Sequence, residues 1–179
     1  MQRKFFWLIE RDTLQKILNL FIFLGIMLFK TKIKNITEKD YKKIELFQKT
    51  FIDFFGNNLW HSDEIRNFHQ NKKNLILIGK EKTKITALGI FVMVDSGLEV
   101  YTIFVEPYSR NHMIGTNFIL KAKQFCKKNL LDYIKLEVNK KNTKAIHFYK
   151  KNKFKKIGIR ENYYDSLDDA LIMKLDLRA

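Results

Sequence analysis

Apolar and polar residues follow one another along most of the chain in two patterns, one typical of strands and one typical of helices. Short apolar or alternating runs predict strands at Lys32–Ile36, Leu75–Ile78, Ile85–Val94, Leu98–Val105, Ile134–Val138, Phe154–Arg160 and Ala170–Leu175. Apolar residues three or four positions apart predict helices from Tyr41, from Ser62, over Ile114–Asn129 and over Asn142–Lys151. A strand meander followed by two helical crossovers predicts an α/β (α+β) domain with a mixed sheet and helices on both faces.

Two local signals mark where elements begin or turn. Thr37 is a candidate N-cap, since Asp40 follows three residues later and Ile36 and Tyr41 are spaced as a hydrophobic staple. Asp95, Ser96 and Gly97 separate two apolar runs and predict a hairpin turn.

Composition limits the class of protein. The 179 residues suffice for one domain, and 46% apolar with 30% charged residues is typical of a globular chain. The single cysteine, Cys126, excludes an internal disulfide and fits a reducing, cytoplasmic compartment. The four histidines lack the spacing of a metal site, so we expect no metal.

The net charge of +15, from 34 basic and 19 acidic residues, has two interpretations. It is compatible with a nucleic-acid partner such as ribosomal RNA. It is also compatible with a compositional bias, because Lys, Asn, Ile and Phe are abundant throughout, and we favour the bias.

Residues 1–30 form a separate hydrophobic extension before the domain expected at 31–179. The run Ile17–Phe29 is nearly all apolar but shorter than the roughly 20 residues of a membrane-spanning helix. It could be a membrane-surface anchor, an extra helix packed on the domain, or an extension outside the native start. We favour the last, with Met27 as a plausible start.

Two strand-to-helix junctions contain candidate chemistry. After Val105 a strand leads through Arg110–Gly115 to a helix whose first N–H groups and dipole favour an anion, phosphate above all. At the second junction Glu137 points away from the apolar face of its strand, and Tyr149 shares one helical face with Ala145. A carboxylate that accepts a proton and a phenol that donates one could therefore meet in one cleft. A solvated glutamate and a packed tyrosine are the alternative.

These residues resemble a known family, the GNAT acetyltransferases. Arg110 and Gly115 match the ends of the family's pyrophosphate loop, whereas Met113 stands where the family has a glycine. A later run matches the family's second motif at Asn142, Ala145, Phe148, Tyr149 and Phe154. Lys153 replaces the glycine of that motif. The runs Leu59–Phe68 and Ile157–Met173 are similar to the RimI-type ribosomal-protein alanine N-acetyltransferases of this family.

The resemblance implies a fold of about seven strands in a centrally splayed sheet, and acetyl-CoA as co-substrate. It implies Glu137 as general base and Tyr149 as general acid. The residues implied to bind the coenzyme are Ile103, Phe104, Val105, Arg110, Asn111, His112, Met113, Ile114, Gly115, Thr116 and Asn142. The residues implied to bind the acceptor are Arg160, Tyr163 and Tyr164.

The implied reaction is acetyl transfer to an α-amine, namely the N-terminal alanine of a ribosomal protein. A lysine or small-molecule amine is the alternative acceptor, and a non-catalytic basic RNA-binding module is the alternative class. In the acetyltransferase interpretation, Met113 either displaces its backbone or holds a strained conformation, and glycine there should tighten acetyl-CoA binding.

Overall fold

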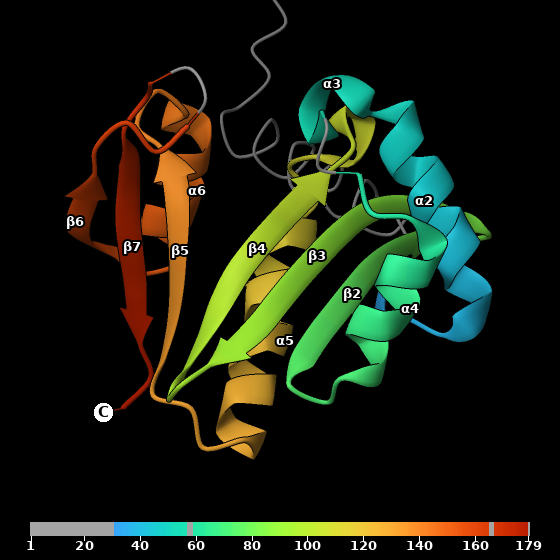
Figure 1. The fold of residues 1–179 in the computed structure, drawn as a ribbon, viewed down its shortest axis with the longest axis horizontal. Coiled ribbons are helices and arrows are strands. Elements are labelled where there is room, and N and C mark those ends of the chain that lie inside the picture. Colours follow the sequence, from blue (N-terminus) through green and yellow to red (C-terminus); the bar gives the residue numbers. More distant parts are fainter. Residues whose placement is uncertain (1–30, 57–58, 165–166, 179) are drawn as a thin grey trace, which may run out of the picture. The chain divides into compact units, whose positions relative to one another are not determined.

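The computed structural model describes residues 31–56, 59–164 and 167–178 of the chain. A seven-stranded sheet forms its centre, in the order β1-β2-β3-β4-β5-β7-β6 (Figure 1). The strands are β1 (Lys32–Asn35), β2 (Asn74–Glu81), β3 (Lys84–Val94), β4 (Gly97–Val105), β5 (Tyr133–Asn139), β6 (Lys155–Arg160) and β7 (Ala170–Asp176). All seven predicted strands are confirmed, with small changes at their ends. The predicted extension of residues 1–30 lies outside the described residues.

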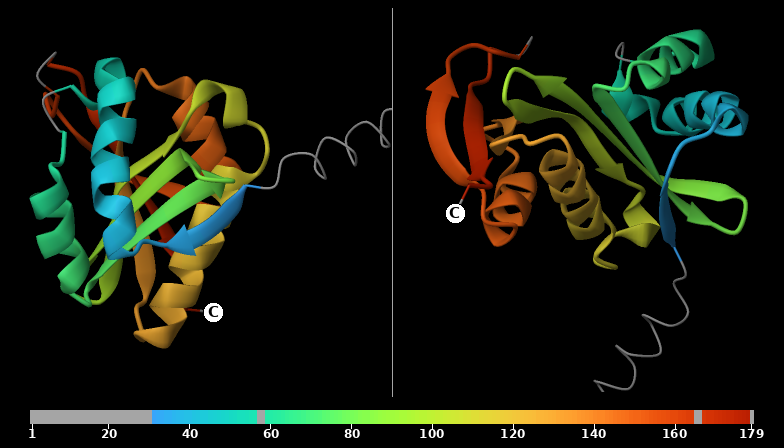
Figure 2. Two further views of the ribbon diagram at one scale, coloured as in Figure 1. Left: turned by 90° about the vertical axis from the view of Figure 1, so that its right-hand side faces the viewer. Right: turned by 90° about the horizontal axis from the view of Figure 1, so that it is seen from below.

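Helices cover both faces of the sheet, as the sequence predicts (Figure 2). One face carries α2 (Tyr41–Thr50), α3 (Ile52–Phe55) and α4 (Ser62–Gln70), and the other carries α5 (Ile114–Lys128) and α6 (Thr143–Lys151). Each layer has its own buried cluster: Leu88 and Phe104 lie in the first, and Phe118 and Leu136 in the second. The sequence analysis missed α3, because its four residues are too short to show a helical period.

The capping signal at Thr37 is confirmed and has a further consequence for the first strand. The Asp40 side chain accepts hydrogen bonds from the backbone N–H and the hydroxyl of Thr37, at 3.0 and 2.9 Å. Lys34 of β1 donates to the same carboxylate oxygen at 2.7 Å. Burial opposes ionisation of Asp40, but the bonds from Lys34 and Thr37 prevail and lower its pKa to about 2. A buried carboxylate therefore ties β1 to the start of α2.

The sheet is antiparallel except at its centre, where β4 and β5 are parallel. They pair only along Gly97–Val100 and Tyr133–Leu136, and Figure 1 shows them diverging beyond that stretch. The pairing stops at a β-bulge, because Phe91 and Ile90 of β3 face Val100 and Thr102 and leave Tyr101 as an extra residue. A bulge bends its strand and increases its twist, so the bulge at Tyr101 turns β4 away from β5. The predicted central splay is confirmed.

Gly97 lies in β4, not in the hairpin turn, so this detail of the sequence analysis was wrong. The turn consists of Asp95 and Ser96, with Asp95 at a positive φ of 50°, and Gly97 pairs with both Val94 and Tyr133. A Cβ on Gly97 would lie 2.1 Å from the Tyr133 ring. The glycine is therefore needed because an aromatic ring from β5 lies across its backbone.

Lys153 ends α6 in a left-handed conformation, with φ 71°. The N–H of Lys153 donates to the carbonyl of Lys150 and the N–H of Phe154 to that of Tyr149, both at 3.0 Å, so the end resembles a Schellman cap. Left-handed geometry costs a non-glycine residue about 1–2 kcal/mol.

We expect Lys153→Gly to stabilise the folded protein by about 0.5–1 kcal/mol, since relief of strain exceeds the extra unfolded-state entropy of glycine. Chemical denaturation of both proteins measures the difference. Lys151→Gly, at the last residue of α6, is the matched control and should destabilise, because glycine has a lower helix propensity than lysine. A less stable Lys153→Gly protein would show that the lysine is not strained.

Candidate active site

The parallel course of β4 and β5 places two strand-to-helix junctions at the same end of the sheet. β4 ends at Val105 and leads through a 3-10 turn, η2 (Pro107–Ser109), and a short loop into α5. β5 ends at Asn139 and leads into α6. Because the two strands are parallel, both junctions lie at their carboxyl ends, where ligands of α/β proteins commonly bind.

The loop into α5 contains two left-handed residues that are not glycine. Asn111 has φ 65°, and Met113, the N-cap, has φ 58° and ψ 9°. Asparagine tolerates this conformation, but methionine is strained in it. Of the two possibilities raised for Met113, the strained conformation is the one observed. His112 lies between them, partly buried.

The first turn of α5 offers backbone donors to an anion. The first hydrogen bond of the helix runs from the N–H of Asn117 to the carbonyl of Met113 at 2.9 Å. The N–H groups of Ile114, Gly115 and Thr116 precede it and have no acceptor carbonyl within the helix. They can therefore donate hydrogen bonds to phosphate oxygens. Gly115 also has a packing role, because a Cβ there would lie 3.0 Å from the Phe148 ring of α6.

A buried carboxylate fixes the base of this loop. Glu106 is 5% exposed, accepts a hydrogen bond from the Ser109 hydroxyl at 2.9 Å and pairs with Lys84 of β3 at 2.8 Å. Its backbone N–H continues the β4 ladder by donating to Thr86. The sequence analysis missed this arrangement, since Lys84 and Glu106 lie 22 positions apart and no local pattern links them.

The residues implied to hold the coenzyme along β4 face in different directions. Ile103 packs against the α5 and α6 cluster, whereas Phe104 lies in the α2–α4 cluster among aromatic rings of α2 and α3. Arg110 donates from Nε to the carbonyl of Val105 at 3.0 Å. In this structure the Arg110 side chain therefore secures the end of β4, and the Val105 carbonyl already has a partner.

Glu137 of β5 lies at the centre of a polar cluster near the splay. Arg160 at the end of β6 approaches it across β7, with Nη1 3.0 Å from Oε1. Tyr163 donates a hydrogen bond to the same carboxylate, which raises the pKa of the Tyr163 phenol to about 12. Burial and the nearby Glu137 charge also raise the pKa of Tyr164, whose ring lies 5.1 Å from that of Tyr163. The structure thus brings Glu137 together with the three residues implied to bind the acceptor.

Tyr149 is 8% exposed and packs between Phe148 and Phe154, with ring centroids at 5.0 and 5.4 Å. Burial raises the pKa of its phenol, and the phenol of Tyr164 adds to the effect. Tyr164 therefore lies close enough to influence Tyr149 and is itself influenced by Glu137. A phenol in this environment stays protonated over the physiological range and is available as a proton donor.

Asn142 is the N-cap of α6, and its Oδ1 accepts the N–H of Ala145 at 3.1 Å. Capping uses the side-chain oxygen and leaves the amide N–H₂ as a donor. Cys126 lies buried in the last turn of α5, where burial raises the pKa of its thiol to about 12. A buried thiol with a raised pKa is a packing residue and not a nucleophile.

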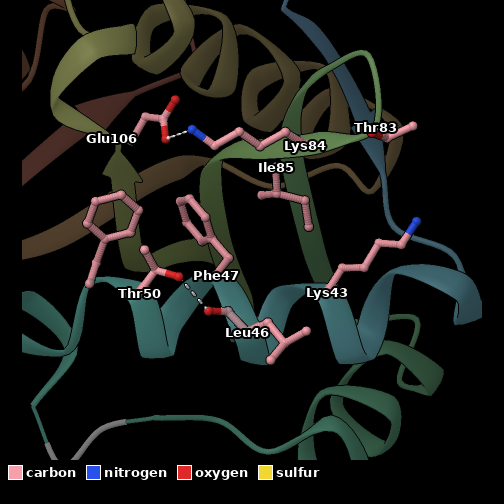
Figure 3. Close-up of a pocket in the computed structure, with 9 residues that line it drawn as sticks. Lys43, Leu46, Phe47, Thr50, Thr83, Lys84, Ile85 and Glu106 are labelled. Atoms are coloured by element: carbon pink, nitrogen blue, oxygen red, sulfur yellow. Dashed lines mark hydrogen bonds and ion pairs between the residues drawn. The ribbon is translucent and has the colours of Figure 1, made fainter.

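A separate cavity of about 470 Å³ opens on the α2 face of the sheet (Figure 3). Its walls are mostly apolar, with the Lys84–Glu106 pair at one edge. The lining residues are Lys43, Leu46, Phe47, Thr50, Phe51, Thr83, Lys84, Ile85 and Glu106. Glu106 thus forms part of this cavity and also fixes the loop that leads to α5.

The described part of the chain contains neither a metal-binding cluster nor a membrane-spanning helix. No group of three or more His, Cys, Asp or Glu side chains there is placed to hold a metal ion. Among the same residues, no helix has the length and apolar character needed to cross a membrane.

Residues 40–154 match the model of the acetyltransferase (GNAT) family. The match covers more than half of the chain, and the splayed sheet and the helix start after β4 agree with it. The chain therefore belongs to the GNAT acetyltransferase family.

A putative [ribosomal protein bS18]-alanine N-acetyltransferase of Bacillus subtilis (strain 168) is 35% identical over 86 residues. The matched stretch is 48% of this chain and 56% of the Bacillus protein, so the chain spans about half the length of this curated relative.

Solved structures share the fold. The ribosomal-protein-S18-alanine N-acetyltransferase of Escherichia coli superimposes with a TM-score of 0.67 at 22% identity, over 83% of this chain and 95% of its own. The PaiA N-acetyltransferase of Thermoplasma acidophilum, solved in complex with coenzyme A, gives 0.67 at 17% identity, over 83% and 99%. At these identities the likeness supports the fold, and the predicted fold class is confirmed.

Proposed function

We propose that the protein is an acetyl-CoA-dependent N-acetyltransferase that acetylates a peptide α-amine, most specifically the N-terminal alanine of a ribosomal protein. One observation carries the proposal. Glu137, joined by Arg160 and Tyr163, lies beside the β4–β5 opening, and a buried phenol, Tyr149, follows on the next helix. The Bacillus relative and the E. coli neighbour are both named for acetylating the alanine of a ribosomal protein, which supports this acceptor.

The junction after β4 fits the coenzyme. The N–H groups that begin α5 are suited to a pyrophosphate, and Gly115 keeps the backbone there uncovered by a side chain. The Asn142 amide is a second donor on the neighbouring junction. The coenzyme A complex of the Thermoplasma neighbour supports this assignment, since the two chains share the fold.

Glu137 would accept the proton of the acceptor ammonium, after which the neutral amine attacks the thioester carbonyl. As the N–C bond forms, the nitrogen loses its second proton to water. The C–S bond breaks, the sulfur takes a proton from Tyr149, and the phenolate regains a proton from water. An α-amine with a pKa near ~7.8 is neutral in about a tenth of molecules at pH 7, against about one in 2,500 for a lysine near ~10.4. Glu137, whose side chain is 20% exposed, is therefore a sufficient base for an α-amine, which favours that acceptor over lysine.

The acceptor is tested with peptides. A peptide with a free N-terminal alanine should be acetylated at its α-amine, whereas a lysine peptide with a blocked N-terminus should react at least tenfold more slowly. Mass spectrometry of cellular N-termini, with and without the protein, then identifies the natural substrate. Equal rates on both peptides would refute the α-amine assignment and favour a lysine or small-molecule acceptor.

Met113→Gly is expected to tighten acetyl-CoA binding several-fold. The backbone of Met113 already holds the left-handed conformation that glycine favours, so the loop keeps its shape. The substitution removes a side chain, 62% exposed, from the start of the anion-binding turn, and lets the phosphates approach more closely. Calorimetric titration with acetyl-CoA measures the change.

Lys153→Gly is the matched control for this titration, because it relieves a similar strain at the far end of α6 and should leave acetyl-CoA affinity unchanged. Weaker or unchanged binding in Met113→Gly would show that the methionine does not obstruct the coenzyme.

The end of α6 and the start of β6 carry a basic surface. Five exposed lysines lie at the end of α6 and the start of β6: Lys150, Lys151, Lys153, Lys155 and Lys156. They form a positive surface that could approach ribosomal RNA during substrate recognition. Such a partner, like a ribosomal-protein substrate, would place the protein in the cytoplasm.

A further inference from the structure

Arg160 forms an ion pair with Glu137 from which another cation can displace the guanidinium. The ion pair joins Nη1 of Arg160 to Oε1 of Glu137 at 3.0 Å. The Arg160 side chain is 54% exposed, whereas that of Glu137 is only 20% exposed. Half-exposed ion pairs of this kind add little stability, so the guanidinium can leave at small cost.

Glu137 and Arg160 each have another partner when their ion pair separates. Tyr163 holds the Glu137 carboxylate by an independent hydrogen bond, so the base stays in place without Arg160. The guanidinium carbon of Arg160 lies 5.0 Å from the centre of the Tyr163 ring, a cation–π contact that does not involve Glu137. Arg160 therefore keeps one contact when the carboxylate is taken.

We propose that Arg160 is a substitute cation that the acceptor ammonium displaces from Glu137. The inference rests on the proposed function, in which Glu137 is the base that meets the amine. An acceptor arrives mostly as an ammonium ion, and it would share one carboxylate with the guanidinium if Arg160 stayed. Two cations at one carboxylate repel each other, so arrival of the ammonium favours departure of Arg160.

This role differs from the acceptor-binding role that the family resemblance implies for Arg160. A residue that binds the acceptor lowers KM, and its loss raises KM. A residue that competes with the acceptor raises KM, and its loss lowers KM. The two roles therefore predict opposite changes for one substitution.

Steady-state kinetics with an N-terminal alanine peptide would compare the parent, Arg160→Gln and Arg160→Lys. Arg160→Gln removes the competing charge and should lower the KM for the peptide about threefold, the scale of one half-exposed ion pair. Arg160→Lys keeps the charge and should stay near the parent. A KM for the glutamine variant that is raised or unchanged would overturn the proposal.

A second measurement does not depend on turnover. The Arg160 side-chain N–H resonance should shift when an amine is added to the full-length protein, using alanine amide as the probe. In Glu137→Gln, which cannot hold the cation, the Arg160 resonance should already lie at the shifted position without any amine. A resonance that does not respond to the amine would refute displacement even if the natural acceptor is a lysine. Absence of peptide acetylation by the parent protein would refute only the proposed function.

Discussion

Tyr149→Phe is expected to lower kcat for acetyl transfer by at least about a hundredfold, the usual contribution of a positioned general acid. The phenol is needed only as the thiolate departs, so the loss appears in kcat and leaves acetyl-CoA binding nearly unchanged. The phenylalanine ring keeps the contacts with Phe148 and Phe154, so the variant should fold like the parent. Kinetics and a thermal shift with acetyl-CoA separate these effects.

Tyr133→Phe is the control for that variant. It removes the phenol hydroxyl of Tyr133, the first residue of β5, whose ring lies beneath Lys174. Its turnover should match that of the parent. If Tyr149→Phe also turned over like the parent, the phenol would be a packing group and another acid, or water, would protonate the thiolate.

Glu137→Gln is the second substitution with a large expected effect. It removes the base, and kcat/KM near pH 7 should fall by about a hundredfold. The dependence of the remaining rate on pH should then follow the titration of the acceptor amine, near ~7.8 for an α-amine. The difference in kcat/KM between the variant and the parent should therefore shrink as the pH rises and the neutral amine accumulates.

Glu137→Gln also has a structural readout in Tyr163. The hydrogen bond to the carboxylate favours the neutral phenol and raises its pKa to about 12, so the variant should titrate Tyr163 at lower pH, towards the ordinary value of 10.0. Ultraviolet titration of tyrosinate absorbance measures this change. Glu45→Gln is the control, because Glu45 of α2 is a similarly exposed carboxylate paired with a cation, Lys49, at 2.7 Å. A parent-like rate in Glu137→Gln would exclude the glutamate as base.

The sequence was sufficient to predict those features that depend on residues close together in the chain. Apolar spacing located α5, and the Thr37 and Asp40 pair located the start of the first helical segment. Met113 and Lys153, which stand where the family pattern has glycine, both hold a left-handed backbone.

The sequence was insufficient where distant residues meet. Nothing local indicates that β7 inserts between β5 and β6, and that insertion places Arg160 across β7 from Glu137. The role of Gly97 was misjudged for the same reason, since the ring that requires it belongs to Tyr133, 36 positions later. The sequence located the residues of the site, but the partners of Glu137 depend on strand order.

The opening between β4 and β5 depends on the length of the backbone and not on the identity of a side chain. Tyr101 is 63% exposed, and its extra backbone unit, not its ring, ends the pairing with β5. Evolution is therefore free to vary the residue at this position, whereas the number of residues between Val100 and Thr102 is constrained. In related chains an insertion or deletion here would alter the width of the cleft more than any substitution on its walls.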